Sequence, residues 1–258
     1  MSDTTPNRLV ALVTGSLRGI GRACALALAR SGFRVALNDR KLAENEGPAA
    51  SLAAEIAALG TDCLPARGDI GDLAEHESIV AAAMGLGGRI DCHVDNFGVG
   101  PRRRGDLPEI QPDSFDESFQ INSRGLFFLT RRVGRHLLAQ TALSTGRRSI
   151  INITSSNAVA VSILRGEYWA AKAASSMITK LFGVRLADAR IGVYDVRPGI
   201  IETDMTRSAK ARYDALIKEH LVLAERWGYP EDVASTVACM AERRLCYTAG
   251  GWSRLMAA

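Results

Sequence analysis

The segment from Leu9 to Ser31 constrains the fold more than any other part of this chain. A short aliphatic run over Leu9–Thr14 enters a glycine-rich turn, and an Ala/Leu-rich helix is expected over Gly19–Ser31. Glycine has no Cβ, so the turn can be tight and can let another group approach the backbone, while the N–H groups at the start of the helix attract phosphate. The glycines, spaced G-x-x-x-G-x-G, are Gly15, Gly19 and Gly21. The segment predicts a site for the pyrophosphate of a dinucleotide; the alternative is a turn that only joins a strand to a helix.

Strands and helices alternate along the chain without a linker, an internal repeat or a low-complexity segment. Such alternation predicts parallel strands, right-handed crossovers and helices on both faces of the sheet. We therefore predict an α/β fold, a single doubly wound Rossmann-type parallel sheet, with residues 1–258 forming one domain. The expected strands are Leu9–Thr14, Arg34–Asn38, Asp62–Ala66 (weakened by Pro65), Cys92–Asp95, Ser149–Thr154 and Ile191–Arg197, and the expected helices are Gly19–Ser31, Ala49–Leu59, Leu73–Met84, Ser114–Leu138 and Tyr168–Ala187.

The residues that follow each expected strand are polar or form turns. In doubly wound folds, ligands bind beyond the carboxyl ends of the strands. After the glycine turn, these segments are Asn38-Asp39-Arg40, Gly68-Asp69-Ile70, Asn96-Phe97-Gly98, Ser155-Ser156 and Pro198-Gly199. We expect them to converge on one rim of the sheet.

Tyr168 and Lys172 lie four residues apart in an expected helix, so both side chains share one face. The pKa of a free tyrosine is near 10, too high for efficient proton exchange at neutral pH. A neighbouring cation stabilises the phenolate and lowers that pKa, which lets a tyrosine act as a general acid or base. Ser155 comes thirteen residues earlier, at a strand end, where it can hydrogen-bond a substrate oxygen.

Composition excludes several classes of protein. The 258 residues are 47% hydrophobic and 23% charged, as in soluble globular proteins. No apolar run is long enough to cross a membrane, and the first residues lack the pattern of a signal peptide, so we predict a cytoplasmic protein. The five cysteines and four histidines show no metal-ligand spacing, and an odd cysteine count without C-x-x-C indicates free thiols rather than a metal site.

The net charge of +4 includes two basic clusters, Arg102-Arg103-Arg104 and Arg131-Arg132. Neither is interleaved with aromatic residues that could stack on bases, so nucleic acid is not an expected partner. A solvated surface is the main interpretation of both clusters. The alternative is attraction of an acidic carrier or of a phosphorylated substrate.

These motifs together resemble the short-chain dehydrogenase/reductase family over almost the whole chain. The matching residues are TGSLRGIG at 14–21, Asp69, Asn96-x-Gly98, Asn122, Ser155, Tyr168-x-x-x-Lys172 and Arg197-Pro198-Gly199. Within the family, RPGIIETDMT at 197–206 and RWGYPEDVA at 226–234 look most like β-ketoacyl-acyl-carrier-protein reductases. The resemblance implies hydride transfer between a nicotinamide and a secondary alcohol or ketone, with a 3-oxoacyl thioester as one substrate.

The resemblance also implies roles for individual residues. Tyr168 would be the general acid/base, Lys172 would lower its pKa and bind the nicotinamide ribose, and Ser155 would orient the substrate oxygen, with Ser156 as the alternative. Asn122 would hold a water in a proton relay to Lys172. The implied cofactor contacts are Gly15, Arg18, Gly19, Ile20 and Gly21 for the pyrophosphate and adenosine side, Asp69 and Ile70 for the adenine, Asn96 and Gly98 for the adenosine ribose region, Ile201 and Thr203 for the carboxamide, and also Asp39, Arg40, Tyr168, Lys172, Pro198 and Gly199.

The cofactor is expected to be NAD, with NADP as the alternative. Asp39 ends the second strand, where a carboxylate accepts hydrogen bonds from the ribose hydroxyls and repels a 2′-phosphate. Arg18 and Arg40 oppose this preference, because guanidinium groups suit that phosphate.

Three segments depart from the family pattern. Asp95 stands where the family has an amide that can donate, and Phe97 stands where it has a methyl group, so both are expected to weaken cofactor binding. The C-terminus lacks the usual V-D-G-G, which puts the last strand and contacts through it in doubt. Arg165-Gly166-Glu167 precedes Tyr168 where substrate would pass, and its charges favour a polar substrate.

Two further hypotheses remain open. The same chemistry could act on a sugar or polyol, or the chain could bind a cofactor without turnover. The expected partners are a small-molecule or carrier-bound carbonyl substrate and further copies of the chain, as a dimer or homotetramer, with no membrane partner.

Overall fold

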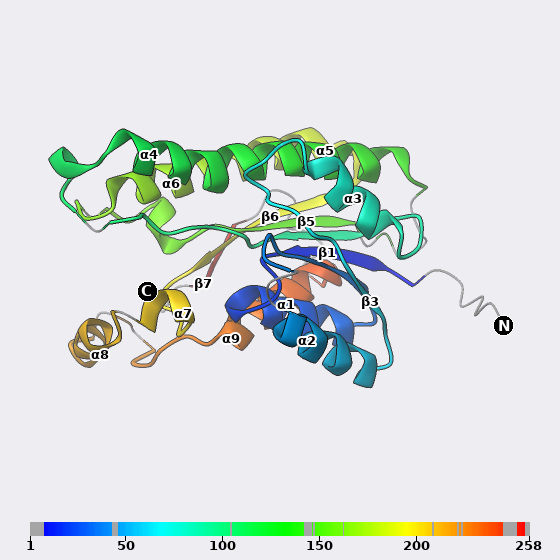
Figure 1. The fold of residues 1–258 in the computed structure, drawn as a ribbon, viewed down its shortest axis with the longest axis horizontal. Helices are drawn as coiled ribbons and strands as arrows, with labels where there is room; N and C mark the ends of the chain where they lie inside the picture. The colour runs from blue at the N-terminus through cyan, green and yellow to red at the C-terminus, as the bar shows by residue number, and fades with distance from the viewer. Residues whose placement is uncertain are drawn as a thin grey trace.

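A computed structural model describes residues 8–42, 46–103, 105–141, 146, 148–161, 163–207, 209–220, 222, 224–244 and, as backbone, 252–255. Its centre is a parallel sheet of seven strands in the order β3-β2-β1-β4-β5-β6-β7 (Figure 1). The strands are β1 Val10–Thr14, β2 Arg34–Asn38, β3 Cys63–Pro65, β4 Cys92–Asp95, β5 Ser149–Ile153, β6 Gly192–Pro198 and β7 Trp252–Leu255. The doubly wound fold predicted from the alternation of strands and helices is confirmed.

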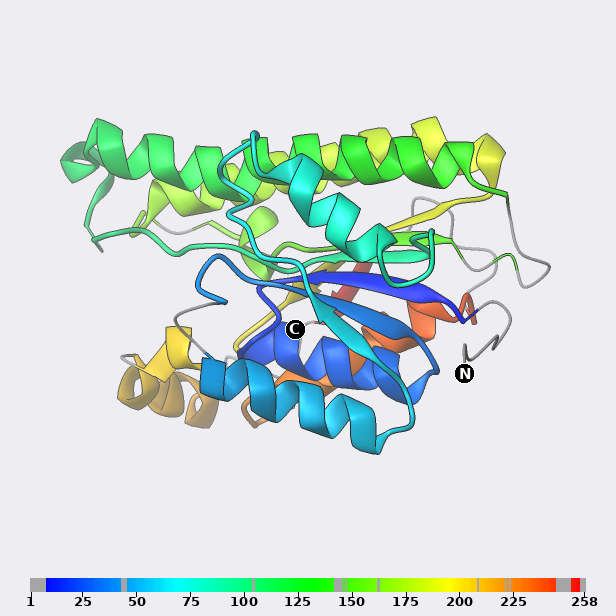
Figure 2. The same cartoon turned by 45° about the vertical axis from the view of Figure 1, so that its right-hand side comes forward.

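Helices cover both faces of the sheet, as Figures 1 and 2 show. One layer holds α1 Gly19–Arg30, α2 Glu46–Ala58 and α9 Pro230–Ala241, and the other holds α3 His76–Met84, α4 Pro112–Phe119, α5 Leu126–Ala139 and α6 Gly166–Leu186. Two short helices, α7 Asp204–Arg207 and α8 Lys210–Lys218, lie at the same end of the molecule as α4 (Figure 1). Single 3₁₀ turns occur at η1 Leu107–Glu109, η3 Ser156–Ala158 and η4 Ala187–Ala189.

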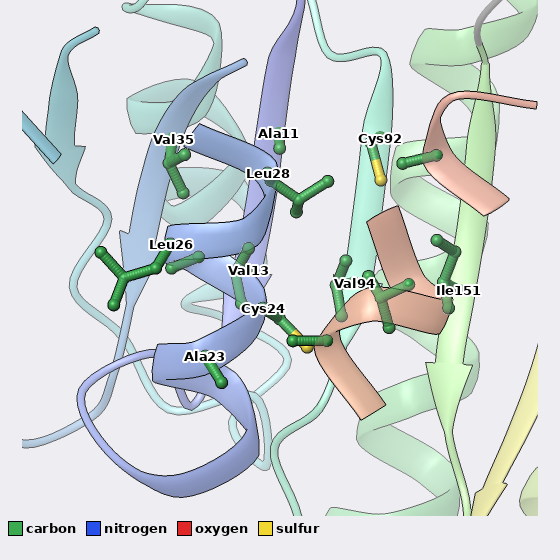
Figure 3. Close-up of a cluster of buried hydrophobic side chains, with 14 of the residues drawn as sticks. Ala11, Val13, Ala23, Cys24, Leu26, Leu28, Val35, Cys92, Val94 and Ile151 are labelled. Carbon is green, nitrogen blue, oxygen red and sulfur yellow. The ribbon is translucent and has the colours of Figure 1, made fainter. Parts of the chain in front are cut away.

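The alternation of side chains along each strand divides the core around the sheet into two clusters, and a third, small cluster of Ile217, Val222 and Trp227 lies apart from them. On β1, Ala11 and Val13 face α1 and α9, whereas Val10 and Leu12 face α3 and α5. Figure 3 shows the first cluster, in which Cys24 lies among aliphatic side chains from α1 and the sheet. Because both faces of the sheet are buried, β1 reads as an almost continuous apolar run in the sequence. The core fixes the positions of the strand ends and thus of the residues that follow them.

The C-terminal strand corrects one expectation. The missing V-D-G-G put this strand in doubt, yet β7 pairs in parallel with β6, with Trp252 opposite Asp195 and Leu255 opposite Pro198. A ladder is made by backbone groups, so the strand does not depend on that motif. The remainder of the C-terminus, at 245–251 and 256–258, is outside the described residues.

The expected helix Ser114–Leu138 was wrong in one important respect. It is interrupted by a π-helical segment, η2 Gln120–Gly125, between α4 and α5. At Gly125 a Cβ would lie 2.4 Å from the carbonyl oxygen of Ile70, so the segment passes unusually close to a loop. Such segments are frequent at functional sites. The sequence pattern also did not predict α7, α8 or α9, and it predicted that the third helix begins at Leu73, whereas α3 begins at His76.

Candidate active site

The glycine turn is tightly closed. Gly15 and Gly19 have φ angles of +61° and +51°, which other residues rarely adopt. A Cβ at Gly21 would lie 2.0 Å from the carbonyl oxygen of Gly15. The first turn of α1 carries no acidic residue, and among the described residues no side chain caps its N-terminus at Arg18. N–H groups at a helix start attract phosphate, and this turn holds no carboxylate that would repel an anion, so the geometry fits a pyrophosphate.

Asn96 holds the glycine turn rather than facing away from it. Its Nδ2 donates to the carbonyl oxygens of Thr14 at 3.0 Å and Gly15 at 3.2 Å. The Thr14 hydroxyl accepts the backbone N–H groups of Asn96 and Phe97, each at 3.0 Å, and donates to Asp95 at 3.1 Å. These bonds tie the end of β4 to the end of β1. Thr14 belongs to the glycine motif of the sequence, but the motif did not predict this role.

Asp39 lies at the end of β2 and is only 8% exposed. Its Oδ1 accepts the backbone N–H of Lys41 at 2.9 Å, which fixes the carboxylate at the rim. Arg40 turns toward Asp69, with 3.8 Å between Nη1 and Oδ2, and its guanidinium lies 5.9 Å from the centre of the Phe97 ring. Arg18 is exposed. One of the two arginines expected to favour a 2′-phosphate is therefore directed at a carboxylate.

The two residues expected near the adenine behave differently. Asp69 is half-buried and its Oδ1 accepts the N–H of Gly71 at 2.8 Å, in a turn at the rim. The side chain of Ile70 is 1% exposed and belongs to the core, and its carbonyl oxygen lies 2.8 Å from Nε2 of His76. A contact from Ile70 to a ligand would therefore have to come from its backbone.

Ser155, Tyr168 and Lys172 meet beyond the carboxyl end of β5. Nζ of Lys172 lies 5.9 Å from the centre of the Tyr168 ring. Burial raises the pKa of Tyr168 above its ordinary value, while a hydrogen bond with Ser155 and the charge of Arg165 lower it. The oxygen of Ser155 also accepts the N–H of Asn157 at 3.1 Å as the cap of η3. Lys172 was expected to lower this pKa, but it is not among the causes of the shift in this structure.

Lys172 is 4% exposed, and its ammonium donates to the carbonyl oxygen of Ile153 at 3.2 Å. Burial lowers the pKa of Lys172 to about 8, while Asp95 and Asp195 raise it. Gly98 makes room for this side chain, because a Cβ there would lie 3.2 Å from Nζ. The lysine is thus a buried cation close to its titration range.

Asn122 lies in the π-helical segment and is 1% exposed. Its amide bonds the backbone of Val99 twice, accepting from N at 3.1 Å and donating to O at 3.0 Å, and it also donates to Ser118. Its own carbonyl oxygen accepts from Ser175 of α6 at 2.7 Å. The side chain thus anchors the segment after β4, so a water in the expected relay would be held by the Asn122 backbone.

The segment after β6 lines a cleft of about 300 Å³ opposite the start of α1. Pro198 ends β6, Gly199 follows it, and Ile201 pairs with Gly228. A Cβ at Gly19 would lie 3.5 Å from Cγ2 of Thr203, so that threonine faces the glycine turn. The cleft is lined by Gly19, Glu202, Thr203, Asp204, Thr206, Arg207, Lys210 and Trp227.

The charges of Arg165 and Glu167 were expected to lie together on the substrate path, and for Glu167 this was wrong. Glu167 is 3% exposed and accepts a hydrogen bond from Ser114 of α4 at 2.9 Å, so it joins two helices. Arg165 is half-buried at the start of α6 with a φ of +76°. Phe97 is also half-buried, packs against the core, and would lie 3.3 Å from a Cβ at Gly15.

A buried ionic network lies beneath the site and was not predicted. Asp195 of β6 accepts from Nε of Arg197 at 2.8 Å and from Ser176 at 2.7 Å, and also bonds Thr154. Arg197 is 4% exposed. The sequence motif Arg197-Pro198-Gly199 did not predict this role, although an acidic residue, Asp195, lies two positions before Arg197, where both side chains point to the same face of the strand. The network links the end of β5 to β6 and α6.

Within the described residues, no three or more histidine, cysteine or acidic side chains gather in a way that could hold a metal ion. No helix among the same residues combines the length and the apolar character needed to cross a membrane.

Several known proteins are similar to this chain in sequence and in fold. A family model described as short chain dehydrogenase matches residues 9–214. A 3-oxoacyl-[acyl-carrier-protein] reductase of Synechocystis sp. is 34% identical over 232 residues, which are 90% of this chain and 88% of that protein. An L-rhamnose 1-dehydrogenase (NAD(P)(+)) of Sphingomonas sp. is 30% identical over 242 residues, or 93% and 91% of the two chains. A crystal structure of a 3-oxoacyl-[acyl-carrier protein] reductase from Brucella melitensis in complex with NAD superposes with a TM-score of 0.92 at 39% identity, covering 98% of this chain and 97% of that one.

The chain therefore belongs to the short-chain dehydrogenase family. It is an oxidoreductase of that family, and the resemblance inferred from its motifs is confirmed.

Proposed function

We propose that this chain is an NAD-dependent reductase or dehydrogenase acting on a secondary alcohol/ketone pair, with a 3-oxoacyl thioester as its substrate. The observation that carries the proposal is the convergence of Ser155, Tyr168 and Lys172 beyond β5, next to Asn122 in its π-helical segment. The 3-oxoacyl-[acyl-carrier protein] reductases among its relatives support the thioester class.

In this proposal Tyr168 gives a proton to the carbonyl oxygen in reduction and takes it back in oxidation. Ser155 already hydrogen-bonds Tyr168, so it can orient the same substrate oxygen. Lys172 supplies a buried positive charge near the ring, which favours the phenolate once a substrate aligns the groups. The Asn122 backbone and Lys172 mark the route by which Tyr168 regains its proton. NAD supplies or accepts the hydride when it is bound.

We propose NAD rather than NADP as the cofactor because of the residues at the carboxyl end of β2. Asp39 is held in place by the Lys41 N–H, and a carboxylate there repels a 2′-phosphate. Arg40 is directed toward Asp69 and Phe97 rather than outward. The reductase from Brucella melitensis, which was solved with NAD, supports the same choice.

A sugar substrate is the second candidate. The L-rhamnose 1-dehydrogenase among the relatives favours it, and so does the charged lining of the cleft after β6, where Lys210 lies 3.2 Å from Glu202. Hydroxyl-rich substrates bind such donors and acceptors well. Binding of a cofactor without turnover is the outcome that would contradict both candidates.

Three broader features are also proposed. The chain forms one domain, since a single sheet contains strands from Val10 to Leu255. It works as a homo-oligomer, in which the exposed apolar side chains of Met177, Leu181 and Val184 on α6 would be covered. The free thiols of Cys24, Cys63, Cys92 and Cys239 support a reducing, cytoplasmic location.

The test is a steady-state assay of the purified protein with NADH and NADPH. Acetoacetyl-CoA and a 3-oxoacyl carrier protein represent the thioester class, and L-rhamnose with NAD⁺ or NADP⁺ represents the sugars. We expect NADH-dependent turnover of the thioesters at a kcat/KM well above that of the sugar reaction. Preference for the sugar would replace the proposed substrate, and cofactor binding by calorimetry without turnover of any substrate would refute an enzymatic role.

A further inference from the structure

Asp95 is a carboxylic acid in the centre of the molecule. It ends β4, it is 1% exposed, and its Oδ1 accepts a hydrogen bond from the Thr14 hydroxyl at 3.1 Å. Its Oδ2 has no hydrogen-bond partner among the described residues, and it faces Nε2 of His93 at 3.9 Å, which has none either. A buried carboxylate with one free oxygen is costly unless a nearby positive charge compensates it.

The ammonium group of Lys172 supplies a positive charge near the Asp95 carboxyl group. Asp95 is paired with Asn152 across β4 and β5, and the Lys172 ammonium donates to the carbonyl oxygen of Ile153, the next residue of β5. Gly98, three residues after Asp95, also lies against Nζ of Lys172. The carboxyl group and the ammonium group are thus at the ends of neighbouring strands, and both are shielded from water. Burial raises the pKa of Asp95 to about 6, while Thr14 and Lys172 lower it.

We propose that Asp95 is a positioning residue that acts through Lys172, holding the buried ammonium charged and in place beside Tyr168. The inference deepens the proposed function, on which it rests, because it concerns the electrostatic support of the same reaction. From the sequence, Asp95 is expected only to weaken cofactor binding, because it stands where the family pattern has an amide. In the structure, its negative charge can stabilise the ammonium group of Lys172, and an amide at this position would carry no such charge.

The other ionisable groups around this pair do not perform that task. His93 is neutral above acidic pH, since burial lowers its pKa to about 4, and burial also lowers the pKa of His76 behind it. Asp195 acts on Lys172 too, but its carboxylate is bonded to Arg197 at 2.8 Å, which compensates its charge. Asp95 has no such arginine among its described neighbours.

The pH dependence follows from the two shifted groups. With Asp95 near a pKa of about 6 and Lys172 near a pKa of about 8, both are charged between these values. Asp95→Asn removes the negative charge and keeps the shape. The pKa of Lys172 must then fall, because an opposite charge that favoured the ammonium is gone, and a close opposite charge shifts a pKa by about 1–3 units.

The direct measurement is an NMR titration of the full-length protein labelled with ¹³C at lysine Cε. The chain has five lysines, Lys41, Lys172, Lys180, Lys210 and Lys218, and Lys172→Arg identifies the signal. We expect Lys172 to titrate about one unit lower in Asp95→Asn than in wild type. Asp91→Asn, at the buried start of the same segment and bonded to Arg89, is the matched control and should leave it unchanged.

Wild type alone also tests the inference if Asp95→Asn does not fold. The Lys172 signal should move in two steps, a small one near pH 6 as Asp95 loses its proton and a large one near pH 8. A single step, or an equal Lys172 pKa in wild type and Asp95→Asn, would overturn the proposal.

Activity gives a second readout, with the 3-oxoacyl thioester of the proposed function as substrate. We expect the alkaline limb of the kcat/KM profile to move down by about one pH unit in Asp95→Asn, with KM for NADH nearly unchanged. A profile that keeps its shape while KM rises would show Asp95 to be only structural. If no substrate turns over but the NMR shift occurs, the proposed function fails while the coupling of Asp95 to Lys172 stands.

Discussion

The two halves of the site, one around β1 and α1 and the other around β4 to β6 and α6, differ in the chemical groups that form them. Around β1 and α1, the site consists mainly of backbone and neutral side chains, with Asn96 and Thr14 closing a turn whose glycines exclude a Cβ, and the charged side chain of Arg18 is exposed at the start of α1. Around β4 to β6 and α6, it consists of buried charges, among them Asp95, Lys172 and the Asp195–Arg197 pair. The first half acts on a ligand mainly through steric fit and backbone hydrogen bonds, and the second acts mainly through buried charges.

Because of this difference, substitutions in the two halves should affect different properties of the protein. Changes near the turn act through steric fit and should affect cofactor binding and stability at all pH values. Changes near α6 act through charge and proton transfer and should affect turnover, with an effect that depends on pH. The predictions below test that division, beginning with the largest expected effect.

Tyr168→Phe should lower kcat by about 10²–10⁴-fold, because it removes the transferable proton and little volume. NAD affinity, measured by calorimetry, should stay near that of wild type. Tyr229→Phe, whose ring is 48% exposed, is the control and should retain activity. Wild-type turnover by Tyr168→Phe would remove this residue from the mechanism.

Gly21→Ala should weaken NAD binding by about ten- to a hundredfold, since the added Cβ would lie 2.0 Å from the Gly15 carbonyl oxygen and forced shifts of this kind cost roughly 1–3 kcal/mol. The loss should be the same at pH 6 and pH 8 by calorimetry. Gly47→Ala is the control, because a Cβ there meets no atom of the described residues within 4 Å. A loss that varies strongly with pH would break the division between the halves.

Asp39→Ala should shift the preference toward NADP by roughly tenfold, since a charged hydrogen-bonding group that also repels the 2′-phosphate is lost. The measurement is the ratio of kcat/KM with each cofactor. Asp62→Ala, at the other end of the strands and paired with Arg34, should leave the ratio unchanged. A wild-type enzyme that already prefers NADP would show that our interpretation of Asp39 is wrong.

Phe97→Ala should have the smallest effect on function. Its ring packs against the core but is half-exposed, so truncation should lower the free energy of unfolding by about 1–2 kcal/mol, less than the ~3–5 kcal/mol of a fully buried ring. Thermal melts and calorimetry on Phe97→Ala, with Phe115→Ala as the exposed-ring control, give both quantities. Tighter NAD binding by Phe97→Ala would instead confirm the steric cost expected from the sequence.

Local patterns in the sequence predicted much of the fold and much of the candidate site. The alternation of apolar runs and helical segments predicted six strands, and the glycine spacing and the Tyr168–Lys172 interval predicted where ligands and chemistry belong. Such features depend on residues close in sequence, where steric freedom at glycine and the pitch of a helix act directly. The β7 strand and α9 escaped prediction, because backbone pairing and packing against α1 supply what their local sequence does not signal.

Only the tertiary structure decided which side chains face one another and which are buried. It placed Glu167 inside the protein rather than on the substrate path, turned the amide of Asn122 to Val99, and set Asp95 near Lys172. Burial and charge coupling arise between elements distant in sequence, and they fix the pKa of each group. The sequence by itself therefore determined which chemical groups this protein brings to its rim, and the folded structure determined their protonation, because the surrounding dielectric and neighbouring charges exist only after packing.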